Sequence, residues 1–379
     1  MTLGIDLIGT NLESGTKTFN LNFLNQIINS KNNKKTYIFI CKHYLKYINI
    51  KKIPKNISLS IKSNFLSKSF FKIIWMQIIF PFELKILKIN KIYSPMNYCP
   101  FLCKVLNIKI ILNIHSNLPW VFYNKMPGSK IKNYLIKIFM YLSIKFCEKL
   151  IVNSIFAKNE IKKKLKIKSS KIFVNYLGVD NVNSLKNNKK DSIKFNFKLN
   201  YILCVSSCVR YHDFFNILTA YKKINEKNNI KFILITQKLD QKYFNEIKKF
   251  INANFKKKEI YVFHNINYGL VEKFYNNALF YIFSSYCEVF GLTSLEAMKN
   301  KCPVLISRSS ALPEINGNAA LYFNPLNVGE LIFKMNKLIK SHKLRNSLIL
   351  KGNIHVKKFK WIYSYKNLMS IIETNNNKI

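Results

Sequence analysis

The chain has 379 residues, which exceeds the size at which a single hydrophobic core usually stops growing, so two domains and a cleft between them are expected. Hydrophobic residues make up 49% of the sequence and aromatic residues 14%, which excludes a disordered or collagen-like chain. The formal net charge of +44 favours an anionic partner such as nucleic acid, an acidic membrane surface or a phosphorylated ligand. Lysines are spread through nearly every segment, however. This distribution favours a bias in amino-acid composition over a single basic binding patch.

The cysteines, the first residues and the longest apolar stretch indicate where in the cell the protein is expected. The eight cysteines form neither a CxxC pair nor a zinc-type spacing with histidine, so they are predicted to be buried thiols in a reducing compartment. Met1–Gly9 resembles a short strand more than a signal peptide. The longest apolar stretch, Phe70–Leu84, is too short and too interrupted to span a bilayer. We expect a cytoplasmic protein, with peripheral association with the inner face of the cytoplasmic membrane as an open alternative.

In the first 180 residues, short apolar runs alternate with longer helical patterns. The predicted strands are Thr36–Ile40, Lys91–Ser94, Lys109–Ile114, Lys149–Asn153 and Lys171–Asn175. This alternation predicts a parallel sheet with helices on both faces. The segment Asn181–Lys198 is rich in Asn, Lys, Ser and Asp and lacks apolar periodicity, so we predict a linker there.

The same alternation resumes beyond the linker. The predicted strands are Tyr201–Val205, Lys231–Ile235, Glu259–Phe263, Leu279–Phe283 and Pro303–Ser307, and the predicted helices are Phe214–Glu226, Gln241–Asn252 and Leu270–Asn277. The sequence therefore predicts two doubly wound α/β domains, over residues 1–180 and 199–360. Residues 361–379 are expected to form a helix that packs back on the first domain.

One segment of the second half carries the pattern of a binding site. A predicted buried strand ends at Phe283, the chain turns at Gly291, and a helix begins near Leu292. Glu288 precedes the turn and Glu296 lies about one helical turn inside the helix. In a doubly wound sheet, ligands bind beyond the carboxyl ends of the strands, and a helix N-terminus there attracts phosphate. No DxD pair occurs in the chain, so a metal-independent diphosphate site is predicted.

The string E-V-F-G-L-T-S-L-E-A-M from Glu288 to Met298, followed by Pro303-Val304 and Leu312-Pro313-Glu314, resembles the signature of family four of the retaining glycosyltransferases. Weaker resemblances extend over most of the chain from about residue 90. They lie at Ile114–Ser116, Asn153–Lys158, Asn175–Asp180 and Phe359–Trp361.

The resemblance implies the GT-B fold, in which two Rossmann-like domains face a central cleft. It implies that Glu288 contacts the donor sugar and that Glu296 contacts the nucleotide ribose. It also implies that the backbone amides of Phe290 to Leu292 hold the sugar and the diphosphate. For His115, at the end of a predicted strand of the first domain, the resemblance implies contact with the donor sugar.

The sequence departs from the family pattern at positions that bear on the diphosphate. Ser207 and His212 stand where family members usually carry an arginine and a lysine. We expect Arg210 and a protonated His212 to supply the missing positive charge. Near residue 15, where family members often show paired glycines, Gly15 is alone, and close approach of a ligand to it remains a prediction.

The function predicted from these features is retaining transfer of a hexose, or a related sugar, from a nucleoside diphosphate donor to an acceptor hydroxyl. The setting expected for it is cell-surface polysaccharide, lipopolysaccharide or glycolipid synthesis, with a saccharide or lipid-linked acceptor and no metal or other cofactor. A nucleotide-sugar epimerase of the same fold and a donor-binding relative without catalysis remain alternatives. A basic nucleic-acid-binding protein is a remote one, because no recognition helix or RNA-binding aromatic motif is visible.

The aromatic and basic region from Tyr44 to Leu84 is a candidate for contact with a membrane. The residues that suggest it are Phe65, Phe70, Phe71, Lys72 and Trp75. Ordinary helix packing accounts for the same pattern, so both interpretations stay open.

Overall fold

The computed structural model describes residues 2–8, 15–30, 34–67, 69–180, 193 and 195–374. It divides into two compact units. The first comprises Met1–Trp120, Lys130–Leu185 and Lys360–Ile379, and the second comprises Val121–Ser129 and Lys186–Phe359. Most of the predicted linker lies outside the described residues, so the domain boundaries stay predictions.

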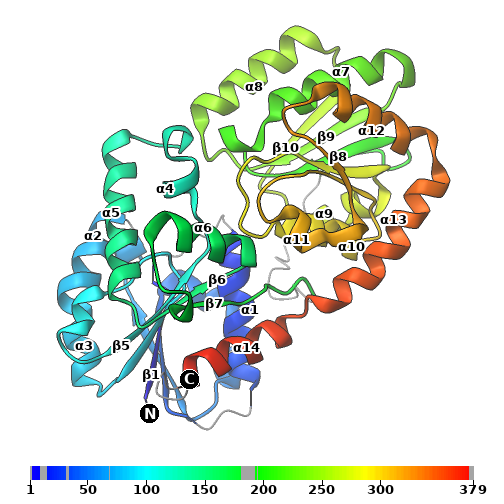
Figure 1. Cartoon of the computed structure of the whole chain (residues 1–379). Helices are drawn as coiled ribbons and strands as arrows, with labels where there is room; N and C mark the ends of the chain where they lie inside the picture. The colour runs from blue at the N-terminus through cyan, green and yellow to red at the C-terminus, as the bar shows by residue number, and fades with distance from the viewer. Residues whose placement is uncertain are drawn as a thin grey trace. The chain divides into compact units, whose positions relative to one another are not determined.

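The first unit contains a seven-stranded sheet of order β3-β2-β1-β4-β5-β6-β7, in which all neighbours are parallel (Figure 1). Its strands are β1 (Leu3–Asp6), β2 (Thr36–Cys41), β3 (Ile57–Lys62), β4 (Lys91–Ser94), β5 (Lys109–Ile114), β6 (Lys149–Val152) and β7 (Ile172–Val174). Its helices are α1 (Gly15–Asn29), α2 (Ser69–Ile74), α3 (Phe80–Ile86), α4 (Leu118–Val121), α5 (Lys130–Phe146), α6 (Ile155–Leu165) and α14 (Trp361–Glu373). The central strands are buried on both faces, as expected for a parallel sheet between two layers of helices.

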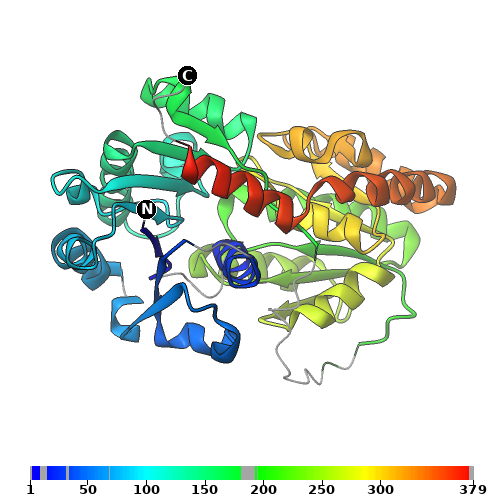
Figure 2. The ribbon, with the colours of Figure 1, turned by 90° about the horizontal axis from the view of Figure 1, so that it is seen from below.

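The last helix, α14, is drawn in red in Figures 1 and 2; it returns to the first unit and packs beside α1. Two buried lysines at the starts of β4 and β6 hold its C-terminal end. The ammonium group of Lys91 donates to the carbonyl of Ile372, and that of Lys149 donates to the carbonyls of Ile371 and Thr374. Positive charge at the C-terminal carbonyls of a helix satisfies unpaired acceptors and opposes the helix dipole. Burial lowers the pKa of both lysines.

The second unit contains a six-stranded parallel sheet of order β10-β9-β8-β11-β12-β13. Its strands are β8 (Tyr201–Val205), β9 (Lys231–Thr236), β10 (Ile260–His264), β11 (Phe280–Phe283), β12 (Val304–Ser307) and β13 (Leu321–Phe323). Its helices are α7 (Phe214–Asn228), α8 (Gln241–Asn254), α9 (Tyr268–Asn277), α10 (Leu292–Lys299), α11 (Leu312–Asn316), α12 (Val328–Lys340) and α13 (His342–His355). The strand order reverses between β8 and β11, which is the position where doubly wound sheets bind ligands.

The two doubly wound α/β sheets confirm the predicted fold class. Two strands were not predicted, β3 and β13, and both lie at the edge of their sheet. β3 reads I-S-L-S-I-K and is only partly buried, while β13 has three residues. An edge strand needs less apolar sequence than a central one, which is why the hydrophobic pattern missed these two. In the described part of the chain, no helix is both long enough and apolar enough to cross a membrane.

Candidate functional site

The candidate site lies in the second unit, beyond the carboxyl ends of β8 and β11. The chain leaves β8 at Val205 and enters a short 3-10 helix, Arg210–His212, before α7 begins. It leaves β11 at Phe283 and passes through a loop to α10. The strand order reverses between these two strands, and in doubly wound sheets this is the position where ligands bind.

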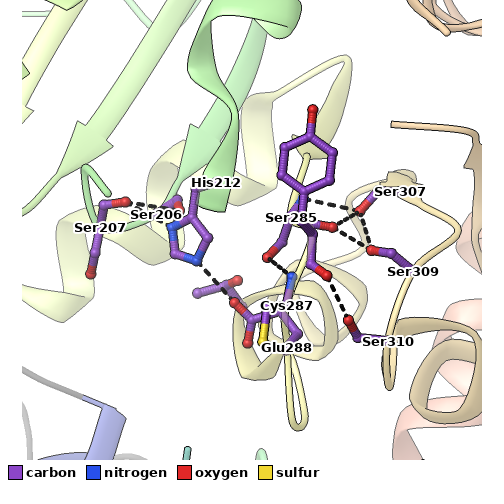
Figure 3. Close-up of polar contacts among 12 residues, drawn as sticks. Ser206, Ser207, His212, Ser285, Cys287, Glu288, Ser307, Ser309 and Ser310 are labelled. Carbon is purple, nitrogen blue, oxygen red and sulfur yellow. Dashed lines mark hydrogen bonds and ion pairs between the residues drawn. The ribbon is translucent and has the colours of Figure 1, made fainter. Parts of the chain in front are cut away.

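A histidine and a glutamate connect the two loops across this position (Figure 3). His212 Nε2 lies 2.9 Å from Glu288 Oε1. On the other side of the ring, Nδ1 lies 2.8 Å from the carbonyl oxygen of Ser207 and 2.6 Å from Ser206 Oγ. The ring is 7% exposed and contacts Phe283 edge-on, with 5.1 Å between the ring centroids.

The partners of His212 hold its ring between the two loops. The carbonyl oxygen of Ser207 and the carboxylate of Glu288 can only accept hydrogen bonds, and they face the two ring nitrogens from opposite sides. The hydroxyl of Ser206 can donate to Nδ1 or accept from it. The geometry therefore places an imidazole, that of His212, at the position where the sequence resemblance expects a lysine.

Further hydrogen bonds keep the two loops together. The amide of Tyr286 donates to the carbonyl of Tyr211 at 2.8 Å. The hydroxyl of Tyr286 donates to Asp213 Oδ2 at 2.7 Å. Asp213 adopts the left-handed conformation, with φ of 43°, at the N-terminus of α7. The backbone that carries His212 is therefore fixed from the β11 side as well as from its own strand.

Serines after β12 support the loop that carries Glu288. Ser307 Oγ accepts from the amide of Ser285 at 3.0 Å and donates to its carbonyl at 2.8 Å. Ser309 Oγ also donates to that carbonyl, and Ser310 Oγ donates to the carbonyl of Tyr286 at 2.9 Å (Figure 3). The sequence analysis did not identify these serines. The signal that was available is three serines within four residues at the end of a predicted strand.

Gly291 turns the chain into α10 and cannot be replaced without strain. Its φ is 84°, and a Cβ atom there would lie 2.5 Å from Leu312 Cδ2. The ring of Phe290 is buried against Phe359, so the backbone of Phe290 is the part that can contact a ligand. Leu292 opens the helix, and the first turn of a helix presents amide donors and partial positive charge to an anion.

Glu296 is a buried acid within α10. Burial raises the pKa of its carboxyl to about 7, and Glu272 adds to this rise while Lys299 opposes it. Lys299 Nζ lies 3.5 Å from Glu272 Oε1, so the Lys299 ammonium group also forms an ion pair with that carboxylate. Holding a carboxyl group in such a place costs stability unless a hydrogen-bonding ligand satisfies it.

Arg210 is held by acidic residues of its own unit. Its Nη2 lies 2.7 Å from Glu246 Oε1, and its Nε lies 3.9 Å from Asp240 Oδ2. The guanidinium also stacks over the ring of Tyr243, 5.1 Å from its centroid. A part for Arg210 in binding diphosphate stays a prediction, and so does one for Ser207, whose carbonyl holds His212.

The two remaining predicted site residues belong to the first unit. His115 follows β5, and its Nδ1 lies 3.0 Å from Asn153 Nδ2. Burial lowers the pKa of His115 to about 4, so its ring is neutral at pH 7. Gly15 is the first residue of α1, and residues 9–14 before it lie outside the described part. Their roles stay predictions.

Comparison with known proteins finds a family match in the second unit. Residues 186–354, which include the predicted site residues of that unit, match the family "Glycosyl transferases group 1". The O-antigen chain mannosyltransferase RfbU of Salmonella typhimurium is 25% identical over 214 residues, which are 56% of this chain and 56% of that protein. The match places residues 186–354, which are less than half of the chain, among the group 1 glycosyltransferase domains. The comparison spans little more than half of the curated relative, so its whole activity does not carry over directly.

Solved structures extend the comparison of fold over nearly the whole chain. A glycosyltransferase from Rickettsia africae has a TM-score of 0.68 at 17% identity and covers 98% of this chain and 97% of its own. Sucrose-phosphate synthase from Thermosynechococcus elongatus scores 0.75 at 13% identity, with 98% of each chain covered. HepE of Anabaena, in complex with UDP and glucose, scores 0.73 at 13% identity and covers 98% of this chain and 99% of its own. These likenesses confirm the predicted GT-B fold.

The raised pKa of Glu296 predicts a pH-dependent stability. Between the ordinary carboxyl pKa of 4.5 and about 7, the folded chain keeps a proton that the unfolded chain releases. Stability therefore falls as pH rises through this window and levels off above it. We expect Glu296→Gln to abolish this pH-dependent loss of stability. At pH 8 the variant should stabilise the ligand-free protein by up to about 3 kcal/mol. Urea unfolding of both proteins at pH 5 and pH 8 measures this difference.

A matched control is Glu226→Gln, on the exposed side of α7, where the side chain is more than half exposed. This variant should keep the stability profile of the wild type. If Glu296→Gln also keeps that profile, the protonated state inferred for Glu296 is wrong.

Proposed function

We propose that this chain is a group 1 glycosyltransferase, and a family four retaining enzyme that transfers a hexose, or a related sugar, from a nucleoside diphosphate donor to an acceptor hydroxyl. One observation carries the proposal. The Glu288–His212 pair lies at the switch point of the second sheet, with Glu288 on the loop that leads into the N-terminus of α10 and His212 in the 3-10 helix before α7. A carboxylate for sugar hydroxyls, and an imidazole and a helix N-terminus for phosphate, thus stand on adjoining segments.

In this proposal each group binds a different part of the donor. Glu288 accepts hydrogen bonds from hydroxyls of the sugar, and the amides of Phe290 to Leu292 hold the sugar and the diphosphate. Glu296 accepts from the ribose hydroxyls, which offsets the cost of its burial. The complex of HepE with UDP and glucose supports a nucleotide-sugar donor here, and that support comes from likeness of fold.

The reaction separates charge at the glycosidic bond. As the bond to the anomeric carbon breaks, negative charge grows on the leaving diphosphate and positive charge grows on the sugar ring. The N-terminus of α10 and the His212 imidazolium stabilise the negative charge on the diphosphate. The Glu288 carboxylate stabilises the positive charge on the sugar ring. We propose that the acceptor hydroxyl attacks from the face that the diphosphate leaves, and that the diphosphate takes its proton. Retention of configuration follows from this same-face attack.

The acceptor is proposed to be a saccharide or a lipid-linked saccharide, bound mainly by the first unit. The curated relative is named an O-antigen chain mannosyltransferase, which supports a role in cell-surface polysaccharide, lipopolysaccharide or glycolipid synthesis. We place the enzyme in the cytoplasm, peripherally on the inner face of the cytoplasmic membrane. His115 is proposed to contact the donor sugar as a neutral ring, and Gly15 is proposed to allow close approach of a ligand.

Loss of the Glu288 carboxylate should reduce transfer strongly. We expect Glu288→Gln to lower the rate by about 10²- to 10³-fold, as loss of one transition-state contact does. The assay is transfer of labelled sugar from UDP, GDP and ADP sugars to saccharide and lipid-linked acceptors. Glu226→Gln is the control and should retain normal rates. Normal turnover by Glu288→Gln would contradict the assignment of Glu288 to the donor site. Nucleotide binding without turnover by the wild type favours the non-catalytic relative, and isomerised sugar from donor alone favours the epimerase.

A second prediction concerns the charge on His212. We expect His212→Lys to keep transfer within about tenfold of the wild type, because it restores a cation next to Glu288. His212→Gln keeps hydrogen bonding but not charge, and we expect a loss of about 10²-fold. The rates of both variants at saturating donor are compared with those of His342→Gln, an exposed histidine on α13. Equal rates in His212→Lys and His212→Gln would show that charge at this position has no part in transfer.

A third prediction concerns metal ions. The positive potential at the proposed diphosphate site comes from His212 and the helix N-terminus, so we propose that no bound metal is needed. Transfer should continue at full rate in excess chelator. Loss of activity in chelator, with recovery on adding Mg²⁺ or Mn²⁺, contradicts this part of the proposal.

A further inference from the structure

A continuous helical stretch of the first unit has two apolar faces. It runs through α2, a π-helical turn (Trp75–Ile79) and α3. The inner face buries Trp75, Met76, Phe80 and Leu84. A surface helix of a soluble domain normally directs polar side chains away from such a face.

The outer face of this stretch is apolar as well. The exposed side chains are Phe71, Ile74, Ile78, Ile79, Phe82 and Ile86, with exposed fractions from 41% to 79%. Five of them follow the helical spacing of three or four residues, so they form one stripe. Leu102 and Val105, which are also exposed, lie at the neighbouring 3-10 helix, Phe101–Lys104. We call these eight residues the apolar ridge.

Hydrogen bonds join the elements that carry the apolar ridge to one another and to α5. Gln77 Nε2 donates to the carbonyl of Cys99 at 2.9 Å, and the amide of Cys99 donates to Ser143 Oγ in α5 at 3.0 Å. Lys85 Nζ donates to the carbonyl of Leu106 at 3.4 Å. In Figure 1, α2, α3 and α5 lie along one side of the first unit. The outer face of α5 adds four exposed apolar side chains, those of Ile131, Tyr134, Leu135 and Tyr141.

The charge around the apolar ridge has one sign. From residue 84 to residue 147 the sequence contains ten lysines and neither Asp nor Glu. Exposed lysines near the ridge include Lys85, Lys88 and Lys104. The acid just before this stretch, Glu83, forms an ion pair with Lys62. An apolar stripe flanked by lysines matches the interface of an anionic bilayer, where apolar side chains reach the acyl boundary and ammonium groups meet phosphates.

We propose that the apolar ridge is a docking surface for an anionic lipid membrane. The residues differ in part from those that the sequence suggested. Trp75 and Lys72 are buried, Phe65 and Phe71 are exposed, and the side chain of Phe70 lies outside the described part. The docking extends the proposed function, because a lipid-linked acceptor lies in the same membrane. It requires no donor, so it can be tested without sugar transfer.

The test is sedimentation of the full chain with vesicles, in the absence of nucleotide sugar. One set of vesicles is phosphatidylcholine alone, and the other also contains phosphatidylglycerol. We expect binding to the anionic vesicles that weakens as salt is raised. The double variant Ile78→Ser with Phe82→Ser should need at least about tenfold more lipid for half binding. Charge reversal by Lys85→Glu with Lys104→Glu should weaken binding to anionic vesicles most.

A matched control is Leu350→Ser with Ile354→Ser, which removes two exposed apolar side chains from α13 in the second unit. This variant should bind vesicles as the wild type does. Far-ultraviolet circular dichroism and a donor thermal shift confirm that every variant is folded, and they report on the donor site separately. Unchanged vesicle binding by the ridge variant overturns the proposal. So does a wild-type dimer that the ridge variant converts to monomer, because a second copy would then cover the ridge.

Discussion

The contact between His212 and Glu288 joins the two loops of the proposed donor site in the second unit. β8 and β11 are neighbours in the sheet but are far apart in the sequence, and their connecting segments run in opposite directions. Without a cross-link, the loops at their ends would be free to separate. The histidine, with its second nitrogen fixed by the carbonyl of Ser207, holds Glu288 in one orientation. The support from Tyr286 and from the serines after β12 serves the same pair. In the proposed function, the Glu288 carboxylate meets the sugar in one geometry, and such preorganisation favours that contact.

Much of the fold could be predicted because its causes are local. Central strands such as β5 and β11 are short apolar runs between helical patterns, and burial on both faces requires that composition. The turn at Gly291 could also be predicted, because a left-handed residue between a strand and a helix favours glycine. The edge strands β3 and β13 could not, because partial burial leaves a weak apolar signal.

The partners within the site were harder to predict. The sequence indicated that Glu288 and His212 belong to one site, but not that they contact each other across 76 positions. It suggested Arg210 as a substitute cation, yet Glu246, which holds Arg210, lies in a different helix. The burial that raises the pKa of Glu296 depends on α9 and on the sheet below, which no local pattern describes. Each of these is a property of two or more segments, so an isolated motif does not contain it.

The position of α14 in the chain has a consequence for how the protein is made. Its residues follow the whole second unit in the sequence, yet it packs in the first unit beside α1 and covers the ammonium groups of Lys91 and Lys149. Domains generally fold as they leave the ribosome, from the N-terminus onward. The first unit is translated first, but its hydrophobic core is completed last. Until then, its two capping lysines have no helix end to bind, and a nascent chain stalled within the second unit carries an unfinished first unit.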